Sequence, residues 1–145
     1  MSHSIVPVSG EYALRATVCL AALPADGSMT ARDLAVMANV PPAFLAKVLR
    51  RLVHHGLLEA QKGHHGGFRL ARAPRDIRVI DVLEAAEVAL ITGHCAFGFE
   101  RCNEAAPCPL HDVYKDLQQM CHSWARENTL ADIDVARIPR LPSPA

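Results

Sequence analysis

Three cysteines within fourteen residues form the group of side chains best suited to chemistry in this sequence. They follow the spacing Cys95-x6-Cys102-x5-Cys108, and His111 stands three residues after the last of them. Glycine, proline and charged residues separate them, whereas cysteines that only fill a core usually stand in apolar segments. Thiolates are soft ligands that select iron–sulfur clusters, zinc or cuprous copper. The spacing therefore predicts a metal or cluster site on a bent loop, with His111 as the nearest candidate for a fourth ligand.

Two alternatives to a cluster remain open. One is a structural zinc ion held by the three thiolates and one imidazole, and the other is a redox-active thiol pair without metal. A small metalloenzyme is a weaker hypothesis, because no base, nucleophile or carboxylate pair stands at readable spacing beside the cysteines. The remaining cysteines, Cys19 and Cys121, lie in apolar helical patterns and are expected to pack as small hydrophobic side chains.

The sequence predicts a cytoplasmic protein. Its first residues lack the charged start and apolar run of a signal peptide, and the longest apolar run, Val18 to Leu23, is too short to span a membrane. Thiols stay reduced in the cytoplasm, so clustered cysteines there indicate metal binding or reactivity before disulfides.

Charge is divided unevenly along a chain whose formal net charge is zero. Residues 1–75 carry nine Lys or Arg against four Asp or Glu, and residues 76–145 carry six against eleven. This asymmetry suggests that the first half binds a polyanion, although chance placement of solvated charges would look the same.

The elements before the cysteines predict a helix-turn-helix. A helix is expected over residues 11–23, and Thr30 stands at capping-box spacing before Asp33 to open a short second helix. After a turn, a third helix is expected over residues 42–55, with apolar side chains on one side. The opposite side carries four basic side chains at i, i+3, i+4 and i+7: Lys47, Arg50, Arg51 and His54. A basic outer face on the second helix of such a pair is typical of recognition in the major groove of DNA.

The stretch "GLLEAQKGHHGGFRLA" predicts a basic β-hairpin, with strands over residues 57–61 and 68–71. A hairpin directly after a recognition helix is a wing. The side chains expected to reach the DNA backbone or the minor groove are Lys62, His64, His65 and Arg69. Because a strand and not a helix follows the glycines, a nucleotide-binding loop is rejected. The paired histidines are interpreted as DNA or solvent contacts, since no acidic or thiol partner accompanies them.

A fourth helix is expected over residues 79–88, and the most regular periodicity of the chain follows the cysteines. Pro109 opens this last helix, whose apolar side is expected to pair with a second copy of the chain. Its members are Leu110, Val113, Tyr114, Leu117, Met120, Cys121 and Trp124.

These features together resemble the bacterial Rrf-two family of winged-helix transcription regulators, in particular its iron–sulfur sensors of the IscR and NsrR type. The resemblance covers nearly the whole chain, from "YALRA" at residues 12–16 to "NTLADI" at residues 128–133. Its most specific part is the wing motif G-x-x-G-G-[FY]-x-L, which begins at Gly63 and is followed about thirty residues later by the three cysteines.

The resemblance implies a homodimer, and we expect it to bind a double-stranded DNA operator and to act as a repressor. It implies a two-iron or four-iron cluster held by Cys95, Cys102 and Cys108, with nitric oxide, redox state or cluster availability as the signal. His111 matches the fourth ligand of some members, and Glu11 matches a carboxylate that other members supply from the partner subunit.

Two departures from the family pattern stand out. Lys62 stands where the wing of the family usually has arginine. Lysine keeps the positive charge but cannot donate the two parallel hydrogen bonds of a guanidinium group. Ala43 and Ala46 stand where IscR-like members place polar base-reading side chains.

We therefore predict a mainly α-helical protein with a small β-hairpin wing, a winged helix-turn-helix joined to a long dimerisation helix. Residues 1–75 would bind DNA, residues 76–134 would hold the cluster and the dimer interface, and residues 135–145 would form a flexible tail.

Overall fold

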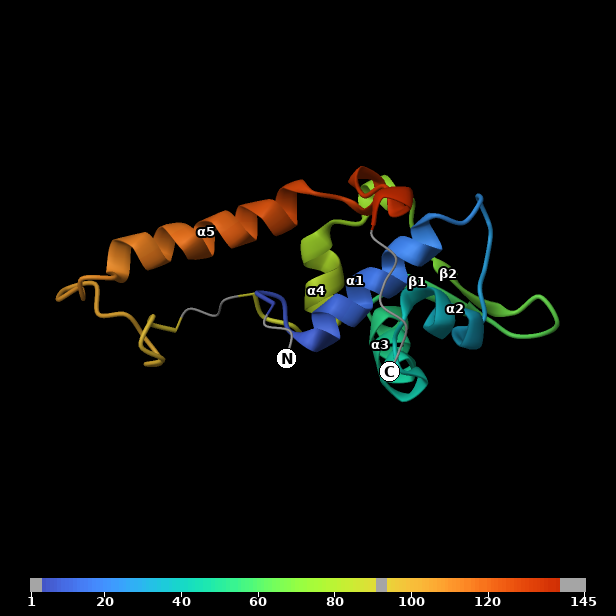
Figure 1. Ribbon diagram of the computed structural model, residues 1–145, viewed down its shortest axis with the longest axis horizontal. Helices are drawn as coiled ribbons and strands as arrows, with labels where there is room; N and C mark the ends of the chain where they lie inside the picture. Colours follow the sequence, from blue (N-terminus) through green and yellow to red (C-terminus); the bar gives the residue numbers. More distant parts are fainter. Residues whose placement is uncertain (1–3, 91–93, 139–145) are drawn as a thin grey trace.

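The computed structural model describes residues 4–90 and 94–138. Helices α1 (Val8–Ala21), α2 (Ala31–Ala38), α3 (Pro42–His54) and α4 (Val79–Ala85) gather with the strands β1 (Leu58–Gln61) and β2 (Gly67–Leu70) into one body (Figure 1). Helix α5 (His111–Glu127) projects from this body and carries the preceding loop at its far end. Short 3-10 helices at Pro74–Asp76, Leu130–Asp132 and Val135–Arg137 complete the described elements.

The helix-turn-helix forms where the local signals predict it. Thr30 caps α2, because its hydroxyl accepts a hydrogen bond from the Asp33 backbone N–H at 3.2 Å, a contact that stabilises a helix by about 1 kcal/mol. Asn39 ends α2 in the left-handed region at φ 50°, which asparagine tolerates better than most residues. Pro42 then occupies the first turn of α3, where its missing N–H costs no hydrogen bond.

One hydrophobic core joins the winged helix to the following segment. Leu45, Leu49 and Leu52 of α3 are fully buried, and so are Val82 and Leu83 of α4. Helix α4 packs against both α1 and α3. The expected boundary between residues 75 and 76 therefore runs through a shared core and does not mark a gap in packing.

The hairpin of β1 and β2 is antiparallel, as predicted, with Glu59 opposite Arg69. Its second strand also meets the segment before α2, because Phe68 exchanges two backbone hydrogen bonds with Met29 at 2.8 and 3.0 Å. Gly67 lies at φ 150°, and a Cβ there would collide with the Met29 backbone. Glycine is required at this position because the wing is anchored so closely to the helix-turn-helix.

The ends of several helices differ from the prediction. Helix α5 begins at His111, two residues after the expected Pro109, and α1 ends at Ala21 and not at residue 23. Helix α1 begins at Val8, three residues before the expected start, because Pro7 supplies its N-cap position. Helix α4 ends at Ala85 and not at residue 88, because Glu87 takes a left-handed conformation at φ 59° that a helix cannot contain.

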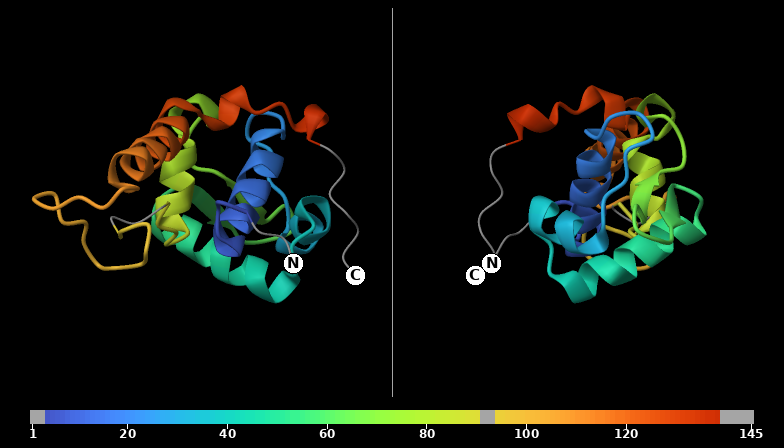
Figure 2. Two further views of the ribbon diagram at one scale, coloured as in Figure 1. Left: turned by 60° about the vertical axis from the view of Figure 1, so that its left-hand side comes forward. Right: turned by 90° about the vertical axis from the view of Figure 1, so that its right-hand side faces the viewer.

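Helix α5 packs on α4, and the chain after it runs back across the end of α1 (Figure 2). Within the described residues, no helix is long and apolar enough to cross a membrane. Of the expected tail, Val135–Arg137 forms a 3-10 helix, and residues 139–145 lie outside the described residues.

Candidate metal centre and nucleic-acid interface

The loop over residues 94–110, here called the cysteine loop, lies at the N-terminal end of α5 and away from the wing (Figure 1). A tight turn positions Cys95, whose N–H donates to the Phe99 carbonyl at 2.9 Å while its own carbonyl accepts from Gly98 N–H at 2.8 Å. Gly98 lies at φ 82°, in the region that favours glycine. The Phe97 N–H points at Cys95 Sγ, at 3.4 Å. This buried sulfur therefore already has a backbone donor.

A second turn lies between the other two cysteines. Asn103 Oδ1 accepts hydrogen bonds from the N–H groups of Ala105 and Ala106, at 3.0 and 3.2 Å, which bends the chain between Cys102 and Cys108. Partial burial raises the pKa of the Cys102 thiol, and Cys95 raises it further by its charge and by a hydrogen bond. Cys108 adds to the same increase in pKa. Cys102 therefore interacts electrostatically with each of the other two thiols.

The cysteine loop is fastened to the first turns of α5. His111 is buried, and its N–H donates to the Cys108 carbonyl at 3.0 Å. Lys115 forms an ion pair with Glu104 of the loop, and this hydrogen bond is the main reason that the pKa of Glu104 is lowered. Gln118 Nε2 also donates to the His94 carbonyl at 3.4 Å. Movement of the loop would therefore be transmitted to α5.

The donor types suit a soft metal or a cluster, but their arrangement is not a closed cage. Among the residues that the structure describes, no group of three or more His, Cys, Asp or Glu side chains is arranged to hold a metal ion. Glu11 lies in the first turn of α1, and its carboxylate is 3.9 Å from Arg15 Nη2. Cys102 interacts with both other cysteines, but the three thiols do not form a metal site among the described residues.

The four basic residues of α3 do not form one stripe. Lys47, Arg50 and His54 are exposed, whereas Arg51 is half-buried and turns toward the end of α4. Its guanidinium forms an ion pair with Glu87 at 3.0 Å and donates to the Ala86 carbonyl at 3.2 Å. The exposed face of α3, here called the outward stripe, consists of Ala43, Ala46, Lys47, Arg50 and His54.

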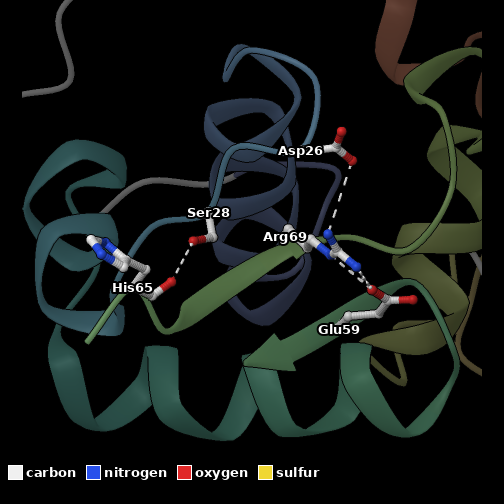
Figure 3. A network of polar contacts seen from close by, with 5 residues as sticks. All are labelled: Asp26, Ser28, Glu59, His65 and Arg69. Atoms are coloured by element: carbon white, nitrogen blue, oxygen red, sulfur yellow. Dashed lines mark hydrogen bonds and ion pairs between the residues drawn. The ribbon is translucent and has the colours of Figure 1, made fainter. Parts of the chain in front are cut away.

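The basic residues of the wing also divide into exposed residues and one that is ion-paired within the subunit. Lys62, His64 and His65 are exposed around its tip. Figure 3 shows Arg69 at its base, where the guanidinium contacts Glu59 at 2.7 Å and Asp26 at 4.0 Å. The Ser28 hydroxyl donates to the His65 carbonyl at 3.2 Å, in the same view. Arg69 therefore joins the two strands and the loop after α1, a role that the cross-strand register could have revealed.

The apolar side chains of α5 also divide into two sets. Tyr114 and Cys121 are half-buried, while the others are 43% to 73% exposed and repeat at alternating steps of three and four residues. This apolar stripe consists of Leu110, Val113, Leu117, Met120 and Trp124. Such a repeat is the a/d pattern of a coiled-coil seam.

Comparison with known proteins decides the family. The model of the Rrf2 family, described as an iron-dependent transcriptional regulator, matches residues 7–135. This chain belongs to the Rrf2 family. A putative HTH-type transcriptional regulator of Aquifex aeolicus is 32% identical over 124 residues, covering 84% of this chain and 85% of that protein. Another from Mycobacterium tuberculosis H37Rv is 32% identical over 130 residues, covering 89% and 80%.

Solved structures share the fold. The global cysteine regulator CymR of B. subtilis superimposes with a TM-score of 0.74 at 19% identity, covering 91% of this chain and 95% of that one. IscR of T. potens gives a TM-score of 0.69 at 23% identity, covering 97% and 94%. The predicted winged-helix fold and the resemblance to this family are confirmed. The chain is a transcriptional regulator and not an enzyme, and regulators of this fold bind DNA through their winged helices.

Proposed function

We propose that this Rrf2 regulator is a homodimeric repressor of the cytoplasm, whose binding to its operator is controlled by an iron–sulfur cluster on the cysteine loop. The observation that carries the proposal is the electrostatic interaction of Cys102 with both Cys95 and Cys108, on a loop joined to α5 by the ion pair of Glu104 and Lys115. The description of the family as iron-dependent supports it. Residues 1–75 would bind DNA, residues 76–134 would sense and dimerise, and residues 135–145 would form the tail.

In this proposal the three cysteines hold the irons and His111 is the favoured fourth ligand, with the partner subunit's Glu11 as the alternative. A bound cluster would supply a centre that reacts with oxidants or nitric oxide. The backbone N–H of Phe97 donates to Cys95 Sγ, and hydrogen bonds to sulfur are one means by which proteins set the potential of a cluster. A non-thiolate ligand leaves one iron more open to attack, and the nature of the cluster, two-iron or four-iron, stays open.

The DNA-binding surface in this proposal is formed by the exposed cations. These are Lys47, Arg50 and His54 of α3 together with Lys62, His64 and His65 of the wing. Arg51 and Arg69 are assigned positioning roles, because each already has carboxylate partners within the subunit.

The dimer interface in this proposal is the apolar stripe of α5. Its a/d repeat leaves five large side chains largely exposed in one subunit, and a second copy would bury them. Tyr114 and Cys121 would support this seam from the side that faces their own subunit. Two winged helices would then lie at a spacing set by α5, so movement of the cysteine loop would change how the pair fits two half-sites.

Anaerobic purification tests the proposal directly. We expect brown protein with iron, sulfide and charge-transfer absorption that bleaches with nitric oxide or oxygen, and an operator affinity that changes when the cluster is lost. Cys102→Ser should abolish the colour, whereas the control Cys121→Ala, outside the loop, should keep it. A brown Cys102→Ser protein, or equal operator affinity with and without the cluster, would refute the proposal.

A thiol switch without iron is the second candidate, supported by the electrostatic interaction of Cys95 with Cys102 that helps to raise the pKa of the Cys102 thiol. It predicts colourless protein in which mild oxidation forms a disulfide between these two residues. Colourless protein with one zinc ion per subunit would instead indicate a structural site formed by the three thiolates and one imidazole.

A further inference from the structure

The part of α3 that would enter a major groove first is apolar. Pro42, Ala43, Phe44 and Ala46 are all exposed, and Lys47 is the first polar side chain of the helix. Phe44 points toward α1, where its ring meets Tyr12 edge-on at 5.9 Å between centroids. The contact holds the first turn of α3 against the body and leaves Ala43 and Ala46 on the outward stripe.

Ala46 also lies at the edge of an open hollow between α3 and the hairpin. This hollow has a volume of about 360 Å³ and is lined mainly by apolar side chains, with Arg50 as its cation. A group that approaches α3 from this side therefore meets methyl groups before it meets hydrogen-bonding groups. Arg51 does not add a polar group to this face, because it is bound to Glu87 and Ala86.

We infer that Ala43 and Ala46 are specificity-determining residues that recognise the operator through the methyl groups of thymines. The inference rests on the proposed binding of DNA by α3, whose N-terminal residues would face the base edges. An alanine side chain can neither donate nor accept a hydrogen bond, so it cannot recognise guanine, cytosine or adenine through their polar groups. In the major groove the apolar feature that distinguishes a base is the thymine methyl, which alanine contacts favourably.

The basic residues of α3 have a different role from the two alanines. Lys47 and Arg50 follow the alanines along the outward stripe and would contact phosphates or guanines. Their charge supplies affinity for any duplex, while the two alanines restrict it to sites with thymines at fixed positions in each half-site.

Replacement of thymine by deoxyuridine isolates the methyl group. The full-length protein, prepared without air, is used to select its preferred duplex from a random pool, and each thymine of that duplex is then replaced singly by deoxyuridine. We expect about fourfold weaker binding at one or two thymines of each half-site, the loss that corresponds to one buried methyl group. Substitution at other thymines should change the affinity less than twofold.

Variants of Ala43 and Ala46 test which alanine contacts which thymine methyl group. Ala43→Gly should remove the deoxyuridine penalty at one position, and Ala46→Gly should remove it at another, with thermal unfolding used to confirm that each variant folds. Because glycine weakens helices by up to about 1 kcal/mol, Ala43→Ser and Ala46→Ser form a second pair that keeps Cβ. Their added hydroxyl should reduce the penalty and broaden the base preference.

Three results would overturn the inference. If every deoxyuridine duplex binds as tightly as its parent, or if the penalty persists in all four variants, Ala43 and Ala46 do not recognise thymine while DNA binding itself stands. If no duplex is bound at all, the proposed function fails together with the inference.

Discussion

Arg51 of the recognition helix and Glu87 after α4 form an ion pair of 3.0 Å, which Arg51 supplements with a hydrogen bond of 3.2 Å to the Ala86 carbonyl. Glu87 occupies the left-handed region at φ 59°, and the next residues, Val88 and Leu90, are buried in the core. The chain then continues toward Cys95. The last turn of α3 is thus bonded to the segment after α4, and we expect this contact to be a route of coupling between α3 and the cysteine loop, which follows in the sequence.

Glu87→Gln should weaken this route without harming the fold. Both side chains are partly exposed, so the ion pair contributes roughly 0–1 kcal/mol to the free energy of unfolding. We expect the ratio of operator affinities with and without the cluster to move toward one, as measured by fluorescence anisotropy under anaerobic conditions. Glu84→Gln, at an exposed carboxylate within α4, is the matched control and should leave the ratio unchanged. An unaltered ratio in Glu87→Gln would remove Arg51 and Glu87 from the route.

Leu117→Arg should separate the subunits. Leu117 is the middle residue of the apolar stripe and is 43% exposed in one subunit, so a charge there costs little in the isolated fold. In a dimer seam the same charge would be buried without a partner, at a cost of several kcal/mol. Sedimentation velocity should show monomers for Leu117→Arg and dimers for Gln119→Arg, whose side chain lies outside the stripe. A dimeric Leu117→Arg would show that another surface joins the subunits.

The salt dependence of binding should distinguish the exposed arginines and lysines from those bound within the subunit. Each phosphate contact contributes about −0.9 to the slope of log affinity against log salt concentration. Lys47→Ala should therefore make the slope less negative by about one unit. Arg69→Ala should leave it nearly unchanged, because Glu59 already neutralises this guanidinium. A reduced slope for Arg69→Ala would mean that its ion pair opens and the side chain binds phosphate.

Lowering the pH should destabilise the N-terminal turn of α4. The pKa of Asp81 is lowered, first by its side-chain hydrogen bonds from Arg78, and its carboxylate also accepts from the Arg78 backbone N–H at 2.9 Å. A lowered pKa means that the ionised carboxylate stabilises the folded chain above the usual carboxyl range, and that this contribution disappears as the pH falls through the lowered value.

The variant Asp81→Asn tests this predicted pH dependence of the free energy of unfolding. Near neutral pH this variant should lose about 1 kcal/mol of the free energy of unfolding, the typical value of a helix N-terminal cap. In urea unfolding series, the difference from the parent chain should shrink as the pH falls below that of ordinary carboxyl groups. A difference that stays constant down to strong acid would contradict the assigned role of the charge.

Local signals were enough to predict the winged helix. Thr30, Asn39, Pro42 and the wing glycines act within a few residues of their own position, so the sequence reveals their effect directly. The metal site of Cys95, Cys102 and Cys108 follows from residue type and spacing and stays a prediction, whereas the turn at Gly98 that positions Cys95 was not predicted. The choice between His111 and Glu11 as fourth ligand stays a prediction.

Contacts between distant segments could not be read in the same way. Nothing near Arg51 in the sequence indicates that it bonds to residues 86 and 87, so its charge was grouped with Lys47 and Arg50. The apolar periodicity of α5 likewise did not distinguish two faces of the helix. Tyr114 and Cys121 are partly covered by their own subunit, whereas Leu117 is exposed. Periodicity shows that a face is apolar and does not show which body covers it.

The exposed apolar stripe of α5 should make the stability and DNA binding of this regulator depend on its own concentration. If folding is completed only when two copies meet, dilution favours the separated and less stable form. The melting temperature should then rise with protein concentration, and occupancy of a paired binding site should depend on the square of the amount of chain made. While the site is far from saturated, halving the amount of chain would therefore lower its occupancy by more than half.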